Sequence, residues 1–212
     1  MKNPDFHNDV FINCPFDNNY KPLFEATIFT VHDCGFRPRC ALEARDGTEV
    51  RITKIFNLIA SCKYGIHDIS RTDLDETNNL PRFNMPLELG IFLGAKKFGT
   101  GLHKKKNCLI LEKEQYRYQE YISDISGQDV YHHNDNPEHV VKQIRDWLAN
   151  TSERISVPSS QNIWLRFLKF KDDLPQMCES VNLDIDDLIF RDISMLISAW
   201  LETYGKSATY AA

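Results

Sequence analysis

The 212-residue sequence lacks several features that would assign it to a protein class directly. It has no apolar run of about 18 residues, the length of a membrane-spanning helix, and its first residues lack the apolar core of a signal peptide. Its net charge of −5 gives no electrostatic basis for nucleic-acid binding. We therefore expect a cytoplasmic protein with neither a membrane nor a nucleic acid as partner.

Motifs for common cofactors and metals are also missing. The six cysteines form no CxxC pair, which is typical of buried reduced thiols rather than of a disulfide framework or a zinc site. No GxGxxG or GxxxxGK[ST] motif is present, so the usual dinucleotide fingerprint and the P-loop are excluded. We interpret His132 and His133, with Asp135, as a surface loop, and the lysine run 104–106 as a solvated one. The sequence predicts no metal and no bound cofactor.

Short apolar strands alternate with amphipathic helices along residues 1–152. Strands are predicted at 9–16, 36–44, 63–70 and 107–113. Helices are predicted at 20–34, at 52–61, from the opening proline Pro86, at 116–125 and from 137. This alternation predicts a parallel sheet covered on both faces. With right-handed crossovers, it is a flavodoxin-like, doubly wound α/β fold.

Residues 153–212 form a second region, which begins with a polar linker and is helical only. Asp184 is the predicted N-cap of a helix with a long apolar stripe. The stripe consists of Ile185, Leu188, Ile189, Ile193, Leu196, Ile197, Trp200 and Leu201. It must be covered, either as a lid on the sheet domain or as the surface of a homo-oligomer, and the sequence leaves both open.

Ligands of open parallel sheets bind beyond the carboxyl ends of the strands. Three segments that carry polar or aromatic groups meet this edge: Asn13, Phe16 and Asp17; Asp68, Ser70 and Arg71; and Phe83, Asn84 and Glu88. Phe16 or Phe83 is a candidate to stack a base, and Arg39, Arg71 or Arg82 to pair a phosphate. Asp17 is alternatively only a helix cap, and each arginine only a surface residue. His67, on the other face of its strand, is interpreted as a core histidine.

Glu88 is the main candidate for chemistry. Pro86 favours the first turn of a helix, which places Glu88 in that turn, near the strand ends. Gly90 and Gly94 lie on one helical face, so we expect close packing of this helix against the sheet. The alternative is that Glu88 only complements the helix dipole, which is worth about 0.3–1 kcal/mol.

The run FNMPLELGIFLGAKKFG, preceded by a strand that ends in HDIS, resembles the nucleoside 2-deoxyribosyltransferase-like families. The related Toll/interleukin-1-receptor (TIR) NADases keep a comparable glutamate on a comparable helix. The resemblance covers residues 9–150 in element order, and at residue level only the regions of Asp68 and Glu88. Asn84 and Met85 stand where the transferases often have an acidic residue and a glycine, a departure that weighs against transfer between bases more than against glycosidic cleavage.

The resemblance implies that Glu88 attacks or stabilises the anomeric carbon and that Asp68 holds ribose hydroxyls or orients the base. A fixed carboxylate stabilises the oxocarbenium-like sugar of such a reaction. A nicotinamide leaving group is cationic and needs no general acid, whereas a neutral base must be protonated. NAD⁺ is therefore the first candidate substrate, and a nucleoside monophosphate the second.

The family likeness also implies a bacterial anti-phage or toxin effector, with homo-oligomerisation and an activating protein partner. Two other classes stay open. One is a non-catalytic sensor that binds a nucleotide in the same cleft, and the other is an interaction module in which Glu88 is structural. For the enzyme, we expect the carboxylates of Glu88 and Asp68 to share one open pocket.

Overall fold

The computed structural model describes residues 5–43, 47–72, 74, 79–154 and 156–209 of the chain. Its centre is a fully parallel, five-stranded sheet with the order β2-β1-β3-β4-β5. The strands are β1 (Asp9–Asn13), β2 (Arg37–Cys40), β3 (Tyr64–Asp68), β4 (Asn107–Glu112) and β5 (Val130–His132). This is the strand order of flavodoxin-like folds, so the predicted fold class is confirmed.

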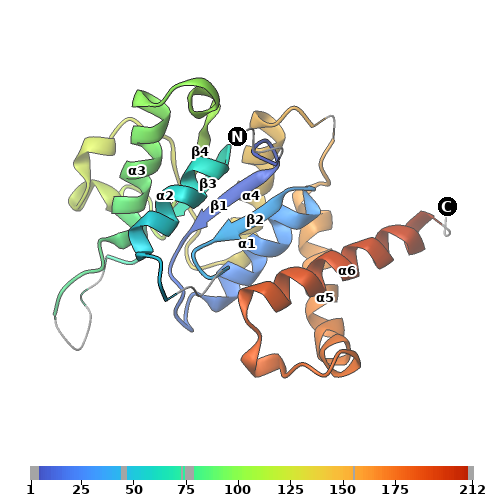
Figure 1. The fold of residues 1–212 in the computed structure, drawn as a ribbon. Coiled ribbons are helices and arrows are strands. Elements are labelled where there is room, and N and C mark those ends of the chain that lie inside the picture. Colours follow the sequence, from blue (N-terminus) through green and yellow to red (C-terminus); the bar gives the residue numbers. More distant parts are fainter. Residues whose placement is uncertain (1–4, 44–46, 73, 75–78, 155, 210–212) are drawn as a thin grey trace.

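Helices cover both faces of the sheet (Figure 1). The side chains of β1 alternate between the two: Val10 and Ile12 pack with α1 and α4, and Phe11 packs with α2 and α3. The helices are α1 (Lys21–Asp33), α2 (Arg51–Ser61), α3 (Asn84–Phe98) and α4 (Pro137–Thr151). Every residue of β1 and β3 is buried between these layers, including the polar residues Asp9, Asn13, His67 and Asp68.

The second strand is shorter than predicted and lies at an edge of the sheet. It covers Arg37–Cys40, and Ala44, the predicted end, lies outside the described residues. Pro38 pairs with Val10 from this edge position, where a residue without an N–H group is tolerated.

The C-terminal region adds α5 (Ser160–Ser180) and α6 (Phe190–Thr209) outside the α1–α4 layer (Figure 1). The ring of Phe29 in α1 lies 5.5 Å from those of Phe167 and Phe170 and 5.9 Å from that of Trp200. The apolar stripe of α6 therefore packs against the sheet domain through its buried members, Ile193, Leu196, Ile197 and Trp200. Homo-oligomerisation stays a prediction.

Two predicted helices differ from the structure. The segment 116–125 forms two 3₁₀ turns, η2 (Arg117–Glu120) and η3 (Ser123–Ile125), preceded by Tyr116 with a φ of 65°. The apolar stripe that begins at Ile185 does not lie on a single helix. Asp184 caps only the short turn η4 (Ile185–Asp187). The α6 helix begins at Phe190, where the Asp192 carboxylate accepts the N–H of Ile189.

The expected close packing at Gly90 and Gly94 is wrong, because a Cβ at either position would meet nothing within 4 Å. The tight contact comes from the strand. A Cβ at Gly65 of β3 would lie 2.7 Å from Nε2 of His67 and 2.8 Å from Cε2 of Phe92. Glycine at position 65 thus lets α3 approach the sheet.

Lys106 corrects the interpretation of the lysine run. Its side chain is buried, and its ammonium donates hydrogen bonds to the carbonyls of Ile59 and Cys62 at the end of α2. Lys104 and Lys105 are exposed, as expected. The buried ammonium therefore links the end of α2 to the start of β4, which directly follows Lys106 in the chain.

All six cysteines are free thiols, and all but Cys108 are buried. Among the helices of the described residues, none is both long and apolar enough to cross a bilayer.

Candidate functional site

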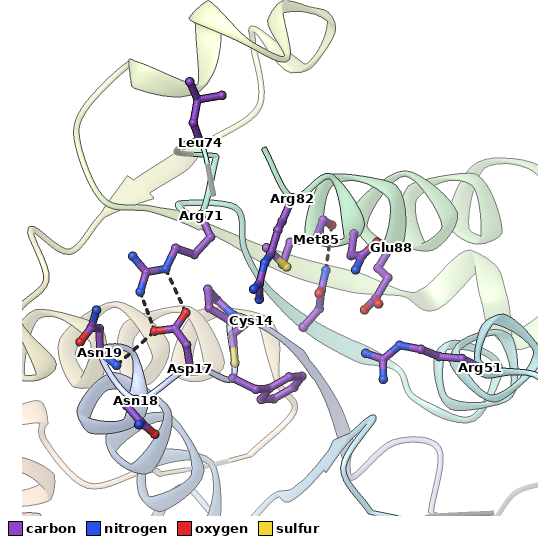
Figure 2. Close-up of a pocket in the computed structure, with 14 residues that line it drawn as sticks. Cys14, Asp17, Asn18, Asn19, Arg51, Arg71, Leu74, Arg82, Met85 and Glu88 are labelled. Carbon is purple, nitrogen blue, oxygen red and sulfur yellow. Dashed lines mark hydrogen bonds and ion pairs between the residues drawn. The ribbon is translucent and has the colours of Figure 1, made fainter. Parts of the chain in front are cut away.

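A cavity of about 780 Å³ opens at the carboxyl edge of the sheet, beyond β1 and β3 (Figure 2). Its walls come from the loop after β1, the start of α2, the loop after β3 and the start of α3. At this edge the connections leave β1 and β3 toward opposite sides, which makes it the topological switch point of the fold. Seven candidates named from the sequence line the cavity: Asn13, Phe16, Asp17, Arg71, Arg82, Asn84 and Glu88.

Glu88 points into this cavity from α3 (Figure 2). It lies in the second turn of the helix, not in the first as predicted, because the helix already begins at Asn84. Its side chain is buried and, among the described residues, makes no hydrogen bond or ion pair. Burial raises the pKa of Glu88 to about 7, although the positive charge of Arg51 acts in the opposite direction. A helix-dipole role is weakened, because that effect fades beyond the first turn.

Arg51 is a residue of the cavity that the sequence interpretation missed. It is the first residue of α2, and its guanidinium points toward Glu88 across the cavity (Figure 2). Its position at the end of the loop after β2, on the same sheet edge as the other ligand loops, was the available signal. The predicted helix began one residue later.

Asn13 fixes the position of α3 relative to the sheet. Its amide nitrogen lies 2.9 Å from the carbonyl oxygen of Met85, to which it donates, and 3.0 Å from Nδ1 of His67. The first turn of the helix that carries Glu88 is thus tied to the end of β1. Both of these contacts use the nitrogen of the Asn13 amide. Its carbonyl oxygen can therefore accept a hydrogen bond from a ligand in the cavity.

His67 is a neutral core histidine, as predicted. Burial, assisted by the nearby Lys106, lowers the pKa of His67 to about 3. Its Nδ1 accepts from Asn13, so Nε2 carries the hydrogen, and the imidazole packs against the ring of Phe92 at 4.9 Å between centroids.

Asp17 caps the turn before α1 and also lines the cavity, while its contact with a ligand stays a prediction. Its Oδ1 accepts the N–H groups of Asn19 and Tyr20, each at 3.1 Å, which caps the turn before α1. The same carboxylate pairs with Arg71, with Nη2 at 2.5 Å and Nε at 3.0 Å (Figure 2). The Arg71 hydrogen bond is the main cause that lowers the pKa of Asp17. This ion pair joins the loops after β1 and β3 and forms one wall of the cavity.

Arg117 holds the loop after β3 from behind. One of its terminal nitrogens lies 2.8 Å from the Ser70 carbonyl oxygen and 2.9 Å from the carboxylate of Glu112, and the other donates to the Thr72 hydroxyl. Ser70 itself is buried and does not line the cavity. The residues around Arg71 are thereby positioned by η2, which the sequence predicted as part of an ordinary helix.

Asp68 does not share the cavity with Glu88, so that expectation is wrong. Its side chain is fully buried and absent from the cavity wall. Oδ2 accepts from the Tyr20 hydroxyl at 2.5 Å and lies 3.0 Å from Nε2 of His133, while Oδ1 accepts from the N–H and the hydroxyl of Ser70. Burial by itself would raise the pKa of Asp68, but the hydrogen bonds from these groups outweigh it and lower the pKa.

The prediction that His133 lies in a surface loop is wrong. The side chain of His133 is fully buried beside Asp68. Its Nδ1 accepts the N–H of Asp135 at 3.0 Å, which leaves the hydrogen on Nε2, facing the carboxylate. Asn134 and Asp135, both with a φ of 53°, reverse the chain and turn the imidazole inward.

The three remaining aromatic and arginine candidates differ in position. Phe83 is 58% exposed and lies outside the cavity wall. Arg39 is bound to Glu43 and Asp9 at the edge of the sheet. Arg82, by contrast, does line the cavity (Figure 2).

In the part of the chain that the structure describes, no group of three or more His, Cys, Asp or Glu side chains is placed to hold a metal ion. The chemistry of the cavity thus rests on one buried carboxyl group and on the guanidinium groups of Arg51, Arg71 and Arg82. Comparison with protein-family models, with curated proteins and with solved structures found no match to this chain.

Proposed function

We propose that the protein is an N-glycosidase that cleaves the base–sugar bond of NAD⁺ or of a related nucleotide. Glu88 is the catalytic residue in this proposal. The observation that carries it is a buried carboxyl that makes no hydrogen bond to any described residue and is aimed into a cavity that three arginines also line. With a pKa of about 7, a substantial fraction of Glu88 is ionised at neutral pH.

Cleavage of the base–sugar bond needs a negative charge beside the anomeric carbon of the sugar. As the base leaves, positive charge develops on the anomeric carbon of the sugar, and a carboxylate in a partly desolvated cavity stabilises it or bonds to it covalently. The helix holds Glu88 rigidly, because Asn13 ties the start of α3 to the sheet. Charge stabilisation of this kind is strongest when the group does not have to reorganise.

The arginines support a phosphate-bearing substrate. Guanidinium groups bind phosphate oxygens in pairs, and Arg51 and Arg82 approach the cavity from opposite sides of Glu88 (Figure 2). Arg71 also lines the cavity, with its charge already paired with Asp17.

The position of Asp68 favours a cationic leaving group. Since Asp68 lies outside the cavity and Asp17 is paired with Arg71, neither is placed as a general acid for a neutral base. Nicotinamide leaves NAD⁺ without protonation. We assign Asp68 a positioning role, in which it holds Tyr20, Ser70 and His133 behind the cavity.

The test is direct. The protein is incubated with NAD⁺, NADP⁺ and a panel of nucleotides, alone and with lysate of the source cells as activator, and free base is measured by chromatography. Turnover that is abolished in Glu88→Gln supports the enzyme. Binding of a nucleotide without turnover under either condition would instead support the alternative function, a nucleotide sensor that uses the same cavity.

A further inference from the structure

A second cavity, of about 590 Å³, adjoins the first on the other side of the loop after β1. The two share Pro15, Phe16, Asp17 and Asn18 as a common wall. The far wall of the second cavity is the segment from η4 to the start of α6. This cavity therefore exists only because the C-terminal region returns to the ligand-binding edge of the sheet.

A row of aromatic rings leads from one cavity into the other. Phe16 lines both cavities, and its ring meets that of Phe24 edge to face at 5.3 Å. Phe24 in turn stacks on Phe190 of α6 at 6.1 Å. Phe16 is 39% exposed, so part of its ring is open to a ligand. Exposed ring surface in a cavity suits a planar base, which can stack on an aromatic side chain.

The charged groups of the two cavities differ. The first has Arg51, Arg71 and Arg82, whereas the second has Lys21 and Arg191 together with Asp186 and Asp187, which are exposed and make no ion pair among the described residues. Carboxylates repel phosphate but accept hydrogen bonds from ribose hydroxyls and from the amino group of a purine. The second cavity thus suits a nucleoside, and the first suits phosphate groups.

We propose that the two cavities form one bipartite site, in which the second holds the distal nucleoside of a dinucleotide. The diphosphate crosses the loop at residues 15–18, with Arg71 on one side and Lys21, at the start of α1, on the other. Each volume alone lies within the range of a small-molecule site, so two adjoining cavities match the two halves of a dinucleotide. This inference rests on the proposed function, which places the scissile half beside Glu88.

The first experiment compares NAD⁺ with nicotinamide mononucleotide, which has the same scissile bond but no distal nucleoside. We expect kcat/KM to be about 10-fold or more higher for NAD⁺. Ile189→Trp fills the second cavity from a residue that is 48% exposed, so the fold tolerates the change, and it should bring this ratio close to one. Met195→Trp, at a residue that is 50% exposed and lines neither cavity, is the matched control and should keep the ratio. Equal cleavage of both substrates by the unchanged protein would overturn the inference and leave the proposed function standing.

The second experiment does not depend on catalysis. ADP, which carries the distal nucleoside of NAD⁺ and two phosphates but lacks the nicotinamide riboside, is titrated into Glu88→Gln protein by calorimetry. We expect binding that weakens about 10-fold when Ile189→Trp is added and is unchanged when Met195→Trp is added. If no nucleotide is cleaved and this pattern is still found, the bipartite site stands and the glycosidase does not. ADP affinity that is insensitive to Ile189→Trp overturns the bipartite site in either case.

Discussion

Glu88 and Asp68 are both buried carboxyl groups near the same edge of the sheet, yet their surroundings differ completely. Asp68 accepts from the hydroxyls of Tyr20 and Ser70 and from the Ser70 N–H, and it faces His133. Among the described residues Glu88 makes no hydrogen bond or ion pair, and the charge of Arg51 acts on it across the cavity. Burial raises the pKa of Glu88 to about 7, whereas the hydrogen bonds of Asp68 outweigh burial and lower its pKa.

The comparison shows that burial alone does not identify a reactive acid. A buried carboxylate whose lone pairs are all used stabilises the fold, because it connects the segments that donate to it. A buried carboxyl without partners costs stability, and such a cost is typical of functional sites. The predictions below separate these two roles.

The largest expected effect is on turnover by Glu88→Gln. The amide keeps the size of the side chain but cannot carry the negative charge, so we expect kcat to fall roughly 10³-fold. Free base released from NAD⁺ is the measurement. Glu179→Gln, an exposed glutamate on α5, is the control and should be fully active. Turnover retained in Glu88→Gln would remove this residue from the mechanism.

Asp68→Asn should act on stability. The new amide nitrogen cannot accept the hydrogen bonds that one carboxylate oxygen of Asp68 accepts. We therefore expect the free energy of unfolding to fall by about 2–4 kcal/mol, measured by denaturant titration. Tyr20→Phe removes one donor only and should cost about 1 kcal/mol. A fully stable Asp68→Asn protein without turnover would show that Asp68 acts in catalysis rather than in positioning.

The pH dependence of stability should distinguish the two acids by sign. The pKa of Glu88 is raised from 4.5 to about 7, so the folded protein binds more protons than the unfolded chain between these values. The contribution of protonated Glu88 to the free energy of unfolding, on the order of 2–3 kcal/mol, is present below pH 4.5. It is lost as the pH rises through 7. The pKa of Asp68 is lowered, so its contribution is present above the ordinary value of 3.8 and is lost as the pH falls below it.

Glu88→Gln should therefore gain stability over the unchanged protein at pH 8 but not at pH 4.5, as measured by thermal or denaturant unfolding. Turnover should rise with pH around 7, where Glu88 ionises. An identical pH profile of stability in the two proteins would mean that Glu88 is not desolvated in the folded state.

The smallest effect is expected for Arg51→Ala. Removal of this positive charge should raise the pKa of Glu88 further, so that the acidic limb of the pH–rate profile moves to higher pH. The KM for a phosphate-bearing substrate should rise about 10-fold. Lys105→Ala, an exposed lysine far from the cavity wall, is the charge control. An unchanged pH profile would show that Arg51 and Glu88 do not interact.

Much of this architecture could be predicted from local patterns. Alternating apolar strands and helices gave the fold class, and the rule for ligand loops in parallel sheets brought Asn13, Asp17, Arg71 and Glu88 to one edge. These predictions succeeded because hydrophobic periodicity depends on residues that are close in sequence, and because the right-handed crossover rule limits how the resulting strands and helices can be arranged. The register of Glu88 was off by a turn, because the start of a helix depends on its cap.

The sequence by itself determined a flavodoxin-like sheet and a carboxyl group on the helix that follows its third strand. Only the tertiary structure decided that Asp68 would be enclosed, because its donors Tyr20 and His133 come from distant loops that meet beneath the cavity. It likewise decided that Lys106 would be buried and that the C-terminal helices would form the second cavity. Long-range contacts assign the partners of a polar group, and those partners decide whether it holds the fold together or stays free to react.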